Sequence, residues 1–319
     1  MNMLGSLIGG LGLFMLGMWL MSDGLKQIAG DRLNQILKNW TNSRLRGLSA
    51  GFLLTAFIQH SGAVTLATIG FANAGILSLR RAMWIVFGSN VGTTVTGWLV
   101  VLIGFNLNIE HFALPLIGIG MAMRLLNSNR AYANIGLALT GFGLLFMGIA
   151  ALKTTFSGAD SLFDLHFSSG LLAVDILLFA LAGLVLTTLL QSSSLTLTLA
   201  LTSLAGGIID LLPAAAIVIG SNLGSTTTAI FAVIGSQPVA KRIVASHIIF
   251  NLLTAIVSLI ILVPLIWSIH WFQQLVVDDV QFTTTLVLFH TVFNLLGVAL
   301  IWKLADPLEN WLKTKFSTT

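Results

Sequence analysis

Long apolar stretches separated by short polar segments run along the whole chain, and they predict a set of membrane helices. A helix needs about 20 residues to cross the hydrocarbon of a bilayer. The predicted segments are 4–21, 47–78, 82–104, 112–126 and 134–152, followed by 170–209, 213–235, 243–268 and 281–302. The pattern therefore predicts an all-α polytopic membrane protein.

Two of these stretches, 47–78 and 170–209, are interrupted by polar phrases near their middle. The first contains QHSG at 59–62 and the second contains QSSS at 191–194. The apolar arms beside each phrase have roughly 11 to 16 residues, which is too short for a full crossing. Each stretch is therefore predicted to form a re-entrant helical hairpin, which enters the bilayer and returns to its own side.

The composition supports a lipid environment for the whole chain. Hydrophobic residues make up 56% of the sequence and charged residues only 8%, whereas soluble domains carry about 25% charged residues. No soluble-looking block separates the apolar stretches, so 1–319 is predicted to be a single integral membrane domain. The chain has no cysteine, which excludes disulfides and thiolate metal sites.

The chain contains an internal repeat. One constant shift aligns GSNVGTTVT (88–96) with GSNLGSTTT (220–228) and QHSG with QSSS, and it gives 15 identities over residues 55–96. A shift shorter by one position matches GLFMLG (12–17) with GLLFMG (143–148). We predict repeat 1 at about 1–126, repeat 2 at about 134–268, an extra helix at 281–302 and a cytoplasmic tail at 303–319.

The charges test this topology independently. If the two hairpins are re-entrant and the other segments cross, fourteen of the fifteen basic residues lie on one side, with Lys153 alone on the other. Such asymmetry is typical of the cytoplasmic side. The two repeats then have inverted topology, the N-terminus is extracytoplasmic and the C-terminus is cytoplasmic, in a multi-pass membrane protein. The basic, amphipathic segment 23–46 is interpreted as an interfacial helix.

The polar phrases indicate the chemistry of a binding site. Broken helices at matched positions of two inverted halves are typical of a midplane site in transporters, and breaks are predicted at both hairpins and at both GSN phrases. A half-helix that begins with Ser or Thr offers free N–H groups and a partial positive charge to an anion. Carbonyl and hydroxyl oxygens at the same breaks suit a hard cation such as sodium. The competing interpretation is close helix packing by small residues.

Few ionisable groups fall inside the apolar segments. None of them carries Lys or Arg at its middle, so an anion would have no cationic side chain to bind it. No carboxylate lies near the breaks, so a proton-coupled mechanism would depend on the histidines, whereas sodium would need only neutral oxygens. HIIFNLL (247–253) and HTVFNLL (290–296) each pair a His with an Asn four residues later. For His60, His247, Asn251, His290 and Asn294, a structural role and a proton-relay role both stay open. The sequence lacks the usual motifs of hydrolases and nucleotide-binding enzymes, so no enzyme activity is predicted.

Taken together, the paired QSSS-type phrase, the following G-S-N-x-G-[ST]-T phrase and the H-x-x-F-N phrase resemble the type II sodium–phosphate cotransporter family. The resemblance covers essentially the whole chain and implies an inverted-repeat carrier with sodium as coupling ion and no cofactor. Carried over by position, the phosphate site would contain Gln59, Ser61, Asn90, Gln191, Ser192, Ser193, Ser194 and Asn222. The sodium site would contain Gln59, Thr93, Thr94, Gln191, Ser193, Ser225 and Thr226.

The sequence departs from this family's pattern in the first hairpin, where QHSG has His60 and Gly62 in place of serines. The expected function is sodium-coupled transport of inorganic phosphate by alternating access, with phosphate, sodium and lipid as partners and no nucleic acid. One alternative is a proton-coupled or exporting carrier of phosphate, another small oxyanion or a dicarboxylate. Another is a channel or regulatory membrane protein without a transport cycle. The oligomeric state stays open, with a homodimer as one option.

Overall fold

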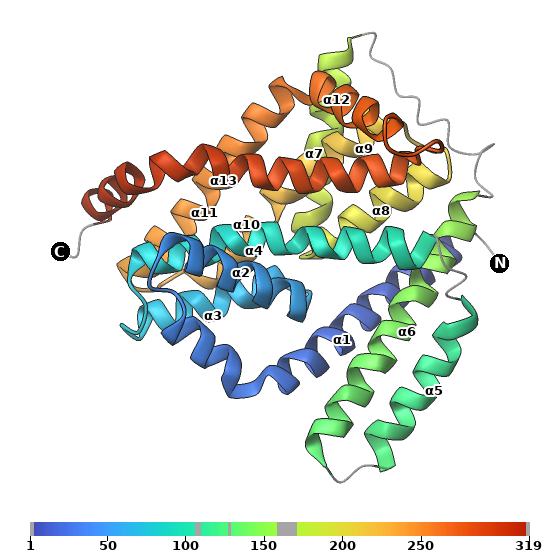
Figure 1. The fold of residues 1–319 in the computed structure, drawn as a ribbon, viewed down its shortest axis with the longest axis horizontal. Coiled ribbons are helices and arrows are strands. Elements are labelled where there is room, and N and C mark those ends of the chain that lie inside the picture. The colour runs from blue at the N-terminus through green and yellow to red at the C-terminus, as the bar shows by residue number, and fades with distance from the viewer. Residues whose placement is uncertain (1–2, 106–109, 127–128, 158–170, 317–319) are drawn as a thin grey trace.

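A computed structural model describes residues 3–105, 110–126, 129–157 and 171–316 of the chain, and these residues form helices joined by short connections (Figure 1). The first half contains α1 (Met3–Asn39), α2 (Arg44–Ile58), α3 (Ser61–Asn73), α4 (Leu79–Leu99), a short π-helix (Val100–Phe105), α5 (Glu110–Leu126) and α6 (Arg130–Ser157). The second half contains α7 (Leu172–Leu190), α8 (Ser193–Ala205), α9 (Leu211–Gly224), α10 (Thr226–Ala232), α11 (Pro238–Ile260), α12 (Leu262–Gln274) and α13 (Phe282–Lys315). No strand occurs in these residues.

Both polar phrases lie at the tips of helical hairpins, as predicted. At each tip a glutamine adopts the left-handed backbone conformation, Gln59 with φ 60° and Gln191 with φ 52°. The next residue caps a new helix, so α2 turns into α3 and α7 turns into α8. Figure 1 shows the α2–α3 hairpin on the left and the α7–α8 hairpin at the upper right, with their tips directed toward the centre of the molecule.

Each hairpin packs against the following long helix through glycines that occupy matching positions in the two repeats. A Cβ atom on Gly88 of α4 would lie 2.0 Å from the carbonyl oxygen of Leu48 in α2. A Cβ on Gly220 of α9 would lie 1.8 Å from the carbonyl oxygen of Ala180 in α7. Small residues let membrane helices approach this closely. The same packing therefore recurs at equivalent positions of the two repeats.

This packing explains one wrong prediction. The GSNVG phrase was expected to break its helix, but α4 runs without interruption from Leu79 to Leu99, because Gly88 and Gly92 serve the contact with α2. A Cβ on Gly92 would lie 2.6 Å from the Cβ of Thr55. Of the two GSN phrases, only the second has a discontinuity, at Ser225 between α9 and α10.

Three other boundaries differ from the sequence-based prediction. Within the predicted helix 23–46, α1 kinks at Gly30, whose φ is 47°, and a second helical stretch follows the kink and ends at Asn39. The predicted segment 243–268 is divided at Ile261 into α11 and α12. The segment 303–319 continues α13 as a helix to Lys315. In the last case the charged residues after Trp302 ended the apolar pattern without ending the helix.

The helices α1 and α6 form an antiparallel pair with reciprocal contacts. A Cβ on Gly17 would lie 2.2 Å from the backbone nitrogen of Leu145, and one on Gly148 would lie 2.4 Å from that of Phe14. The repeat alignment relates Gly17 to Gly148 and Leu145 to Phe14. Each of the two contacts is therefore the other one with the helices exchanged. An interface that maps onto itself in this way is isologous, the property of two-fold symmetry. The α1–α6 contact therefore has the pattern of a pseudo-two-fold axis between the repeats.

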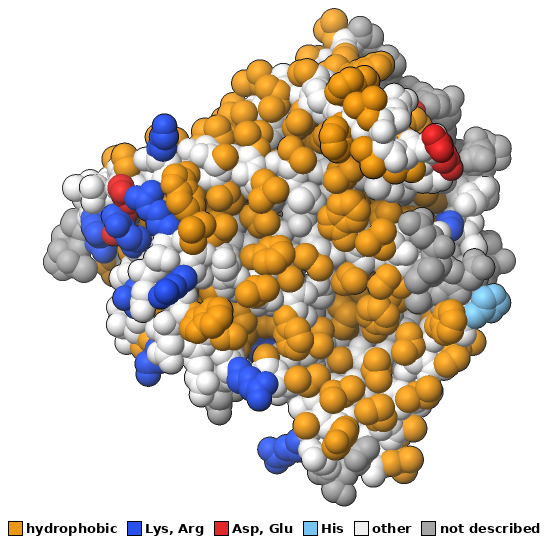
Figure 2. Space-filling model, viewed as in Figure 1, with side chains coloured by type: hydrophobic (Ala, Val, Ile, Leu, Met, Phe, Trp, Pro, Cys, Tyr) orange, Lys and Arg blue, Asp and Glu red, His pale blue; other side chains and the backbone are white. Residues whose placement is uncertain are grey.

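Among the described residues, seven helices are long and apolar enough to cross a membrane. Those starting at Met3, Leu79, Arg130, Leu172, Leu211, Pro238 and Phe282 qualify, while Ser193–Ala205 and His111–Leu126 are shorter apolar helices. Figure 2 shows a broad hydrophobic surface, with Lys and Arg side chains gathered at the left and lower left of the molecule. The chain is thus a multi-pass membrane protein.

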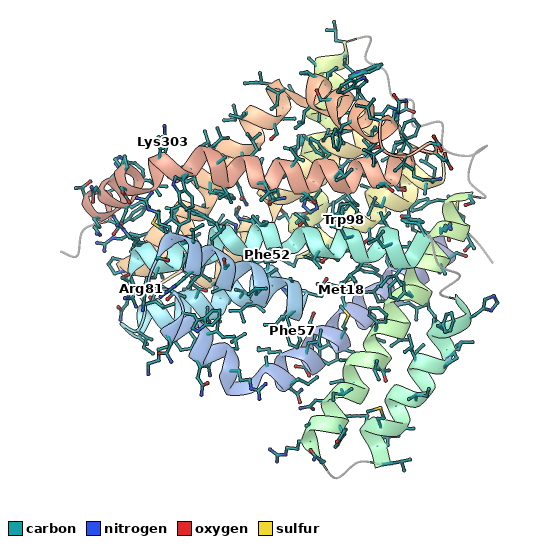
Figure 3. The ribbon with its side chains drawn as sticks, viewed as in Figure 1. Met18, Phe52, Phe57, Arg81, Trp98 and Lys303 are labelled. Carbon is teal, nitrogen blue, oxygen red and sulfur yellow. The ribbon has the colours of Figure 1, made fainter. Side chains whose placement is uncertain are left out.

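Salt bridges fix the beginning of the first hairpin to the C-terminal part of α13. Arg44 at the start of α2 pairs with Asp306 and lies over the rings of Trp84 and Trp302. Arg80, at the start of α4, bridges Asp306 at 2.9 Å and Glu309 at 2.8 Å. Figure 3 shows this end of the molecule, with Arg81 and Lys303 labelled.

Candidate functional site

The two hairpin tips meet at one cavity of about 180 Å³. Of the residues predicted for the site, Gln59, His60, Ser61, Gln191, Ser192, Ser193, Ser194 and Ser225 line it. The α1 side chains Phe14, Met15, Met18, Trp19 and Ser22 form the opposite wall, joined by Gly62, Leu190 and Thr228. Figure 3 shows Met18 on α1 beside the end of α2 that carries Phe57. The structure therefore brings together residues that lie far apart in the sequence, in different repeats.

Each tip is held by the same pair of glutamine hydrogen bonds. The Gln59 side-chain amide donates to the carbonyl oxygen of Ala56, and its Oε1 accepts from the Thr96 hydroxyl at 2.9 Å. In the second hairpin Gln191 Nε2 donates to the carbonyl oxygen of Thr188 at 2.6 Å, and Oε1 accepts from the Thr228 hydroxyl at 2.8 Å. The glutamine thus connects the tip of its hairpin to the end of the GSN phrase in the same repeat.

The N-terminus of a half-helix faces the cavity from each hairpin. The Ser192 hydroxyl accepts from the backbone N–H of Leu195 at 3.2 Å and caps α8. In the first hairpin His60 Nδ1 accepts from the N–H of Ala63 at 3.3 Å and caps α3. The remaining N–H groups of each first turn and the partial positive charge of the helix end favour an anion. Both half-helices can therefore act on the same bound group.

The tips also contact the GSN phrase of the opposite repeat. Ser194 donates to the Thr96 hydroxyl at 3.4 Å. The matching position, Gly62, has no hydroxyl, and a Cβ on it would lie 3.9 Å from the Cγ2 of Thr228. The repeat alignment relates these two contacts to each other. The cavity therefore lies between the two repeats. Each hairpin tip lies next to the end of the GSN phrase of the other repeat.

No Lys, Arg, Asp or Glu is among the described residues that line this cavity. Ser22 and Ser194 are buried, and Ser22 Oγ has no hydrogen-bond partner among the described residues. No cluster of His, Asp and Glu suited to a transition metal occurs in the described part of the chain either. The site therefore offers hydroxyl groups, amides and backbone N–H groups.

The predicted residues Asn90 and Asn222 do not line the cavity. Their side-chain amides donate to the same oxygen, Oδ1 of Asn251 on α11, at 3.2 and 3.4 Å. Asn251 in turn donates to the backbone oxygen of Asn222 at 2.7 Å and lies 3.2 Å from Nε2 of His247. Asn251 thus joins matching positions of the two repeats beside the site. These hydrogen bonds connect α11 to α4 and α9, which is what the structural interpretation of the His247–Asn251 pair requires.

Asn251→Ala is expected to lower the free energy of unfolding by about 1–3 kcal/mol, because buried amide groups of both repeats lose their partner. Asn294→Ala is the matched control, since its side chain bonds only the carbonyl oxygen of His290 in its own helix. Thermal unfolding of the two variants in the same detergent measures the difference. Equal melting temperatures would contradict the bridging role of Asn251.

Of the remaining predicted sodium ligands, Ser225 lines the cavity, whereas Thr93, Thr94 and Thr226 are not among its lining residues. The hydroxyls of Thr93 and Thr94 donate to the backbone oxygens of Ser89 and Val91 within α4. The hydroxyl of Thr226 at the start of α10 donates to the backbone oxygen of Leu223 in α9. A smaller cavity of about 10 Å³ lies between Ser61, Thr65, Ser225, Thr228 and His247. His290 and Asn294 line neither cavity.

The sequence-based prediction missed two groups of residues in the site. Thr96 and Thr228, the partners of the tip glutamines, end the two aligned GSN phrases, so the repeat itself could have indicated them. The α1 wall was missed because its Met, Phe and Trp side chains look like ordinary lipid-facing residues. The matching GLFMLG and GLLFMG phrases mark α1 only as one of the two paired helices.

Fold and site together define a polytopic helical membrane protein with a polar cavity between two hairpin tips. The sequence matches the family described as Na+/Pi-cotransporter over residues 13–154 and 174–277. This match covers most of the chain, and the chain belongs to that family. It is a family of transporters and not of enzymes.

Similar proteins come from bacteria and animals. The chain is 27% identical to the uncharacterized protein YqeW of Bacillus subtilis over 92% of both chains. It is 26% identical to a protein of Escherichia coli provisionally named inorganic phosphate export protein YjbB, over 97% of this chain and 55% of that one. A segment covering 30% of the chain is 29% identical to human sodium-dependent phosphate transport protein 2B, over 14% of that protein. No solved structure matches the chain.

Proposed function

We propose that this protein couples the movement of inorganic phosphate across the membrane to sodium. The observation that carries the proposal is the cavity between the two hairpin tips, which receives one half-helix N-terminus from each repeat. Membership of the Na+/Pi-cotransporter family supports phosphate as the substrate. The name of the human relative, a sodium-dependent phosphate transport protein, supports sodium as the coupling ion.

The pseudo-symmetry of the site suits a tetrahedral anion. Phosphate has two-fold axes through its centre, so two of its oxygens can face each hairpin. On the second hairpin the hydroxyls of Ser192 and Ser193 line the cavity and are available as donors around one such pair of oxygens. On the first hairpin Ser61 is the corresponding hydroxyl. Because no Lys or Arg is among the described residues that line the cavity, no such side chain there compensates the negative charge of the anion.

Sodium would supply that compensating charge. Neutral oxygens suit it as a hard cation, and the cavity offers Gln59 Oε1, Gln191 Oε1 and the hydroxyl of Ser225. Each glutamine Oε1 accepts one hydrogen bond from a threonine and has a second lone pair. Because the attraction between cation and anion is stronger inside a protein than in bulk water, the two are expected to bind together.

For the transport cycle, we take the two repeats to be inverted in the membrane, with re-entrant hairpins. The reciprocal, antiparallel contact of α1 and α6 supports this arrangement, since its pseudo-two-fold axis is perpendicular to the helices. The glycine contacts make α1 and α6 a close-packed unit that forms one wall of the cavity. Alternating access would then result from movement of the hairpins and the long helices α4 and α9 relative to this wall.

Single cysteines can test the proposed topology, because the natural chain has none. Lys303→Cys on α13 is expected to react with a membrane-impermeant maleimide only from the cytoplasmic side, and Lys153→Cys on α6 only from the outside. Labelling of intact cells and of inside-out vesicles distinguishes the two sides. Lys241→Cys, exposed on α11, is a second cytoplasmic position. Labelling of Lys153→Cys and Lys303→Cys from one common side would overturn the topology.

Phosphate flux into proteoliposomes tests the proposed function. With labelled phosphate outside, an inward sodium gradient is expected to accelerate uptake relative to an equal potassium gradient, and uptake should saturate with phosphate. A proton gradient in the absence of sodium tests the proton-coupled alternative. Uptake that is the same in sodium and potassium would contradict sodium coupling, and flux without saturation would favour a channel.

The physiological direction of transport is a separate question, which the name of the Escherichia coli relative raises by describing phosphate export. A coupled carrier runs in whichever direction the combined gradients of phosphate and sodium dictate. Phosphate efflux from preloaded cells that express the protein, compared with uptake by the same cells, measures the direction. Faster efflux than in cells without the protein would favour export.

A further inference from the structure

The two hairpin tips differ at two positions that the repeat otherwise aligns. The first has His60 and Gly62 where the second has Ser192 and Ser194. All four residues line the cavity. The pair of differences is therefore confined to the surface that a bound anion would touch, while the glutamine and the central serine are the same in both tips.

The hydrogen bond of His60 decides which of its nitrogens carries the proton. Nδ1 accepts from the N–H of Ala63, so in the neutral ring the hydrogen is on Nε2. His60 is an exposed residue, unlike the neighbouring Gln59, which is 4% exposed. No described residue accepts a hydrogen bond from Nε2. The ring thus caps α3 with one nitrogen and keeps a donor free with the other.

Gly62 provides the space for this ring. A Cβ on residue 62 would lie 3.0 Å from Cε1 of His60 and 3.3 Å from Nδ1. These distances are shorter than ordinary van der Waals contact, so a side chain at position 62 would push the ring away from its capping position. In the second tip the residue that matches Gly62 is Ser194, and the residue two positions before it is Ser192, which is much smaller than histidine. Histidine at 60 and glycine at 62 are therefore a coupled pair.

We propose that His60 is a further phosphate-binding residue, which donates its Nε2–H to the anion in place of a serine hydroxyl, and that Gly62 allows it to do so. The inference rests on the proposed function of the same cavity. A ring nitrogen reaches farther than a hydroxyl, and the Nε2–H can only donate. The first tip therefore selects an oxygen of the anion that carries no proton, while the serines of the second tip can donate or accept.

Three variants test the proposal through phosphate binding to purified protein in sodium, measured by calorimetry. His60→Ser keeps a good helix cap but loses the ring donor, so its melting temperature should match the wild type while its affinity for phosphate falls about tenfold, as expected for a hydrogen bond to an anion. Gly62→Ser should also weaken binding, by displacing the ring. The double variant H60S/G62S reproduces the second tip and should bind more tightly than Gly62→Ser alone.

The outcomes separate this inference from the proposed function. If the wild type binds phosphate and His60→Ser binds it equally well, His60 is not a ligand and the inference is overturned. Additive effects of the two substitutions would overturn the coupling between positions 60 and 62. A wild-type protein that binds no phosphate would instead overturn the proposed function. Ser203→Ala, on α8 but away from the cavity, is the control for general effects on the protein.

Discussion

Gly220→Ala is expected to destabilise the protein strongly, because it adds a methyl group where two helix backbones touch. The added Cβ would lie 1.8 Å from the carbonyl oxygen of Ala180, so backbone on both α7 and α9 must shift. Overpacking of this kind costs about 3 kcal/mol or more. The second hairpin would lose its support on α9, and we expect a clear fall in the melting temperature and in the yield of monodisperse protein by size-exclusion chromatography.

Two further variants make this result specific. Gly88→Ala places a Cβ 2.0 Å from the carbonyl oxygen of Leu48, so the first repeat should respond as the second does. Gly118→Ala is the matched control, because a Cβ there has nothing within 4 Å and alanine favours helix. If Gly220→Ala melts at the same temperature as Gly118→Ala, the close packing of α7 on α9 is not a feature of the protein.

Gln191→Ala is expected to reduce sodium-driven phosphate uptake by more than tenfold, with little loss of folded protein. Both glutamine and alanine carry a Cβ, so the left-handed backbone at this position is strained alike in the two proteins. The substitution therefore removes mainly the side-chain amide, which joins the tip to Thr228 and faces the cavity. Loss of the positioned tip should lower the affinity for phosphate and sodium together.

Matched variants define where this effect comes from. Gln59→Ala should act in the same way in the first repeat, since Gln59 accepts from Thr96 as Gln191 accepts from Thr228. Thr228→Val combined with Gln191→Ala should cost little more than Gln191→Ala alone, because both remove one hydrogen bond. Gln274→Ala, at an exposed glutamine in α12, is the control. Normal uptake by Gln191→Ala would show that the tip glutamine is not part of the site.

The hairpin tips could be predicted from the sequence because their signals are local and repeated. A polar phrase inside an apolar stretch has few explanations in a membrane protein, since backbone that leaves the helix must find partners in protein or water. Its recurrence at the matching position of the second repeat placed the tips at Gln59 and Gln191. The resemblance to a transporter family implied a shared site at these tips, and the structure places both tips at one cavity.

Glycine was the main source of error, because it has two uses. In GSNVG the glycines were interpreted as a helix break, but they allow α4 to approach α2 while the helix continues. A sequence alone does not distinguish a glycine that turns the backbone from one that admits a neighbour. Gly30, inside a polar segment, does the reverse: it interrupts α1 within a stretch where a continuous amphipathic helix was expected.

Contacts between distant elements lay beyond sequence reasoning for a different reason. For Asn251 a structural role was one of two open interpretations, but no pattern in the chain indicates that Asn90 and Asn222 both donate to it. Those two asparagines were assigned to the phosphate site because they belong to the aligned GSN phrases. In the structure they support the site from α4 and α9, and the cavity is lined by the tips, by α1 and by Ser225 and Thr228 of the second GSN phrase.

A titration of purified protein with phosphate, in sodium and in an equal concentration of potassium, tests the central proposal most directly. Isothermal calorimetry in the same detergent and buffer measures the affinity in both salts. If one cavity binds both ions together, phosphate should bind at least tenfold more tightly in sodium, and sodium should bind more tightly in phosphate by the same factor. Equal phosphate affinity in the two salts would contradict a shared site for phosphate and sodium.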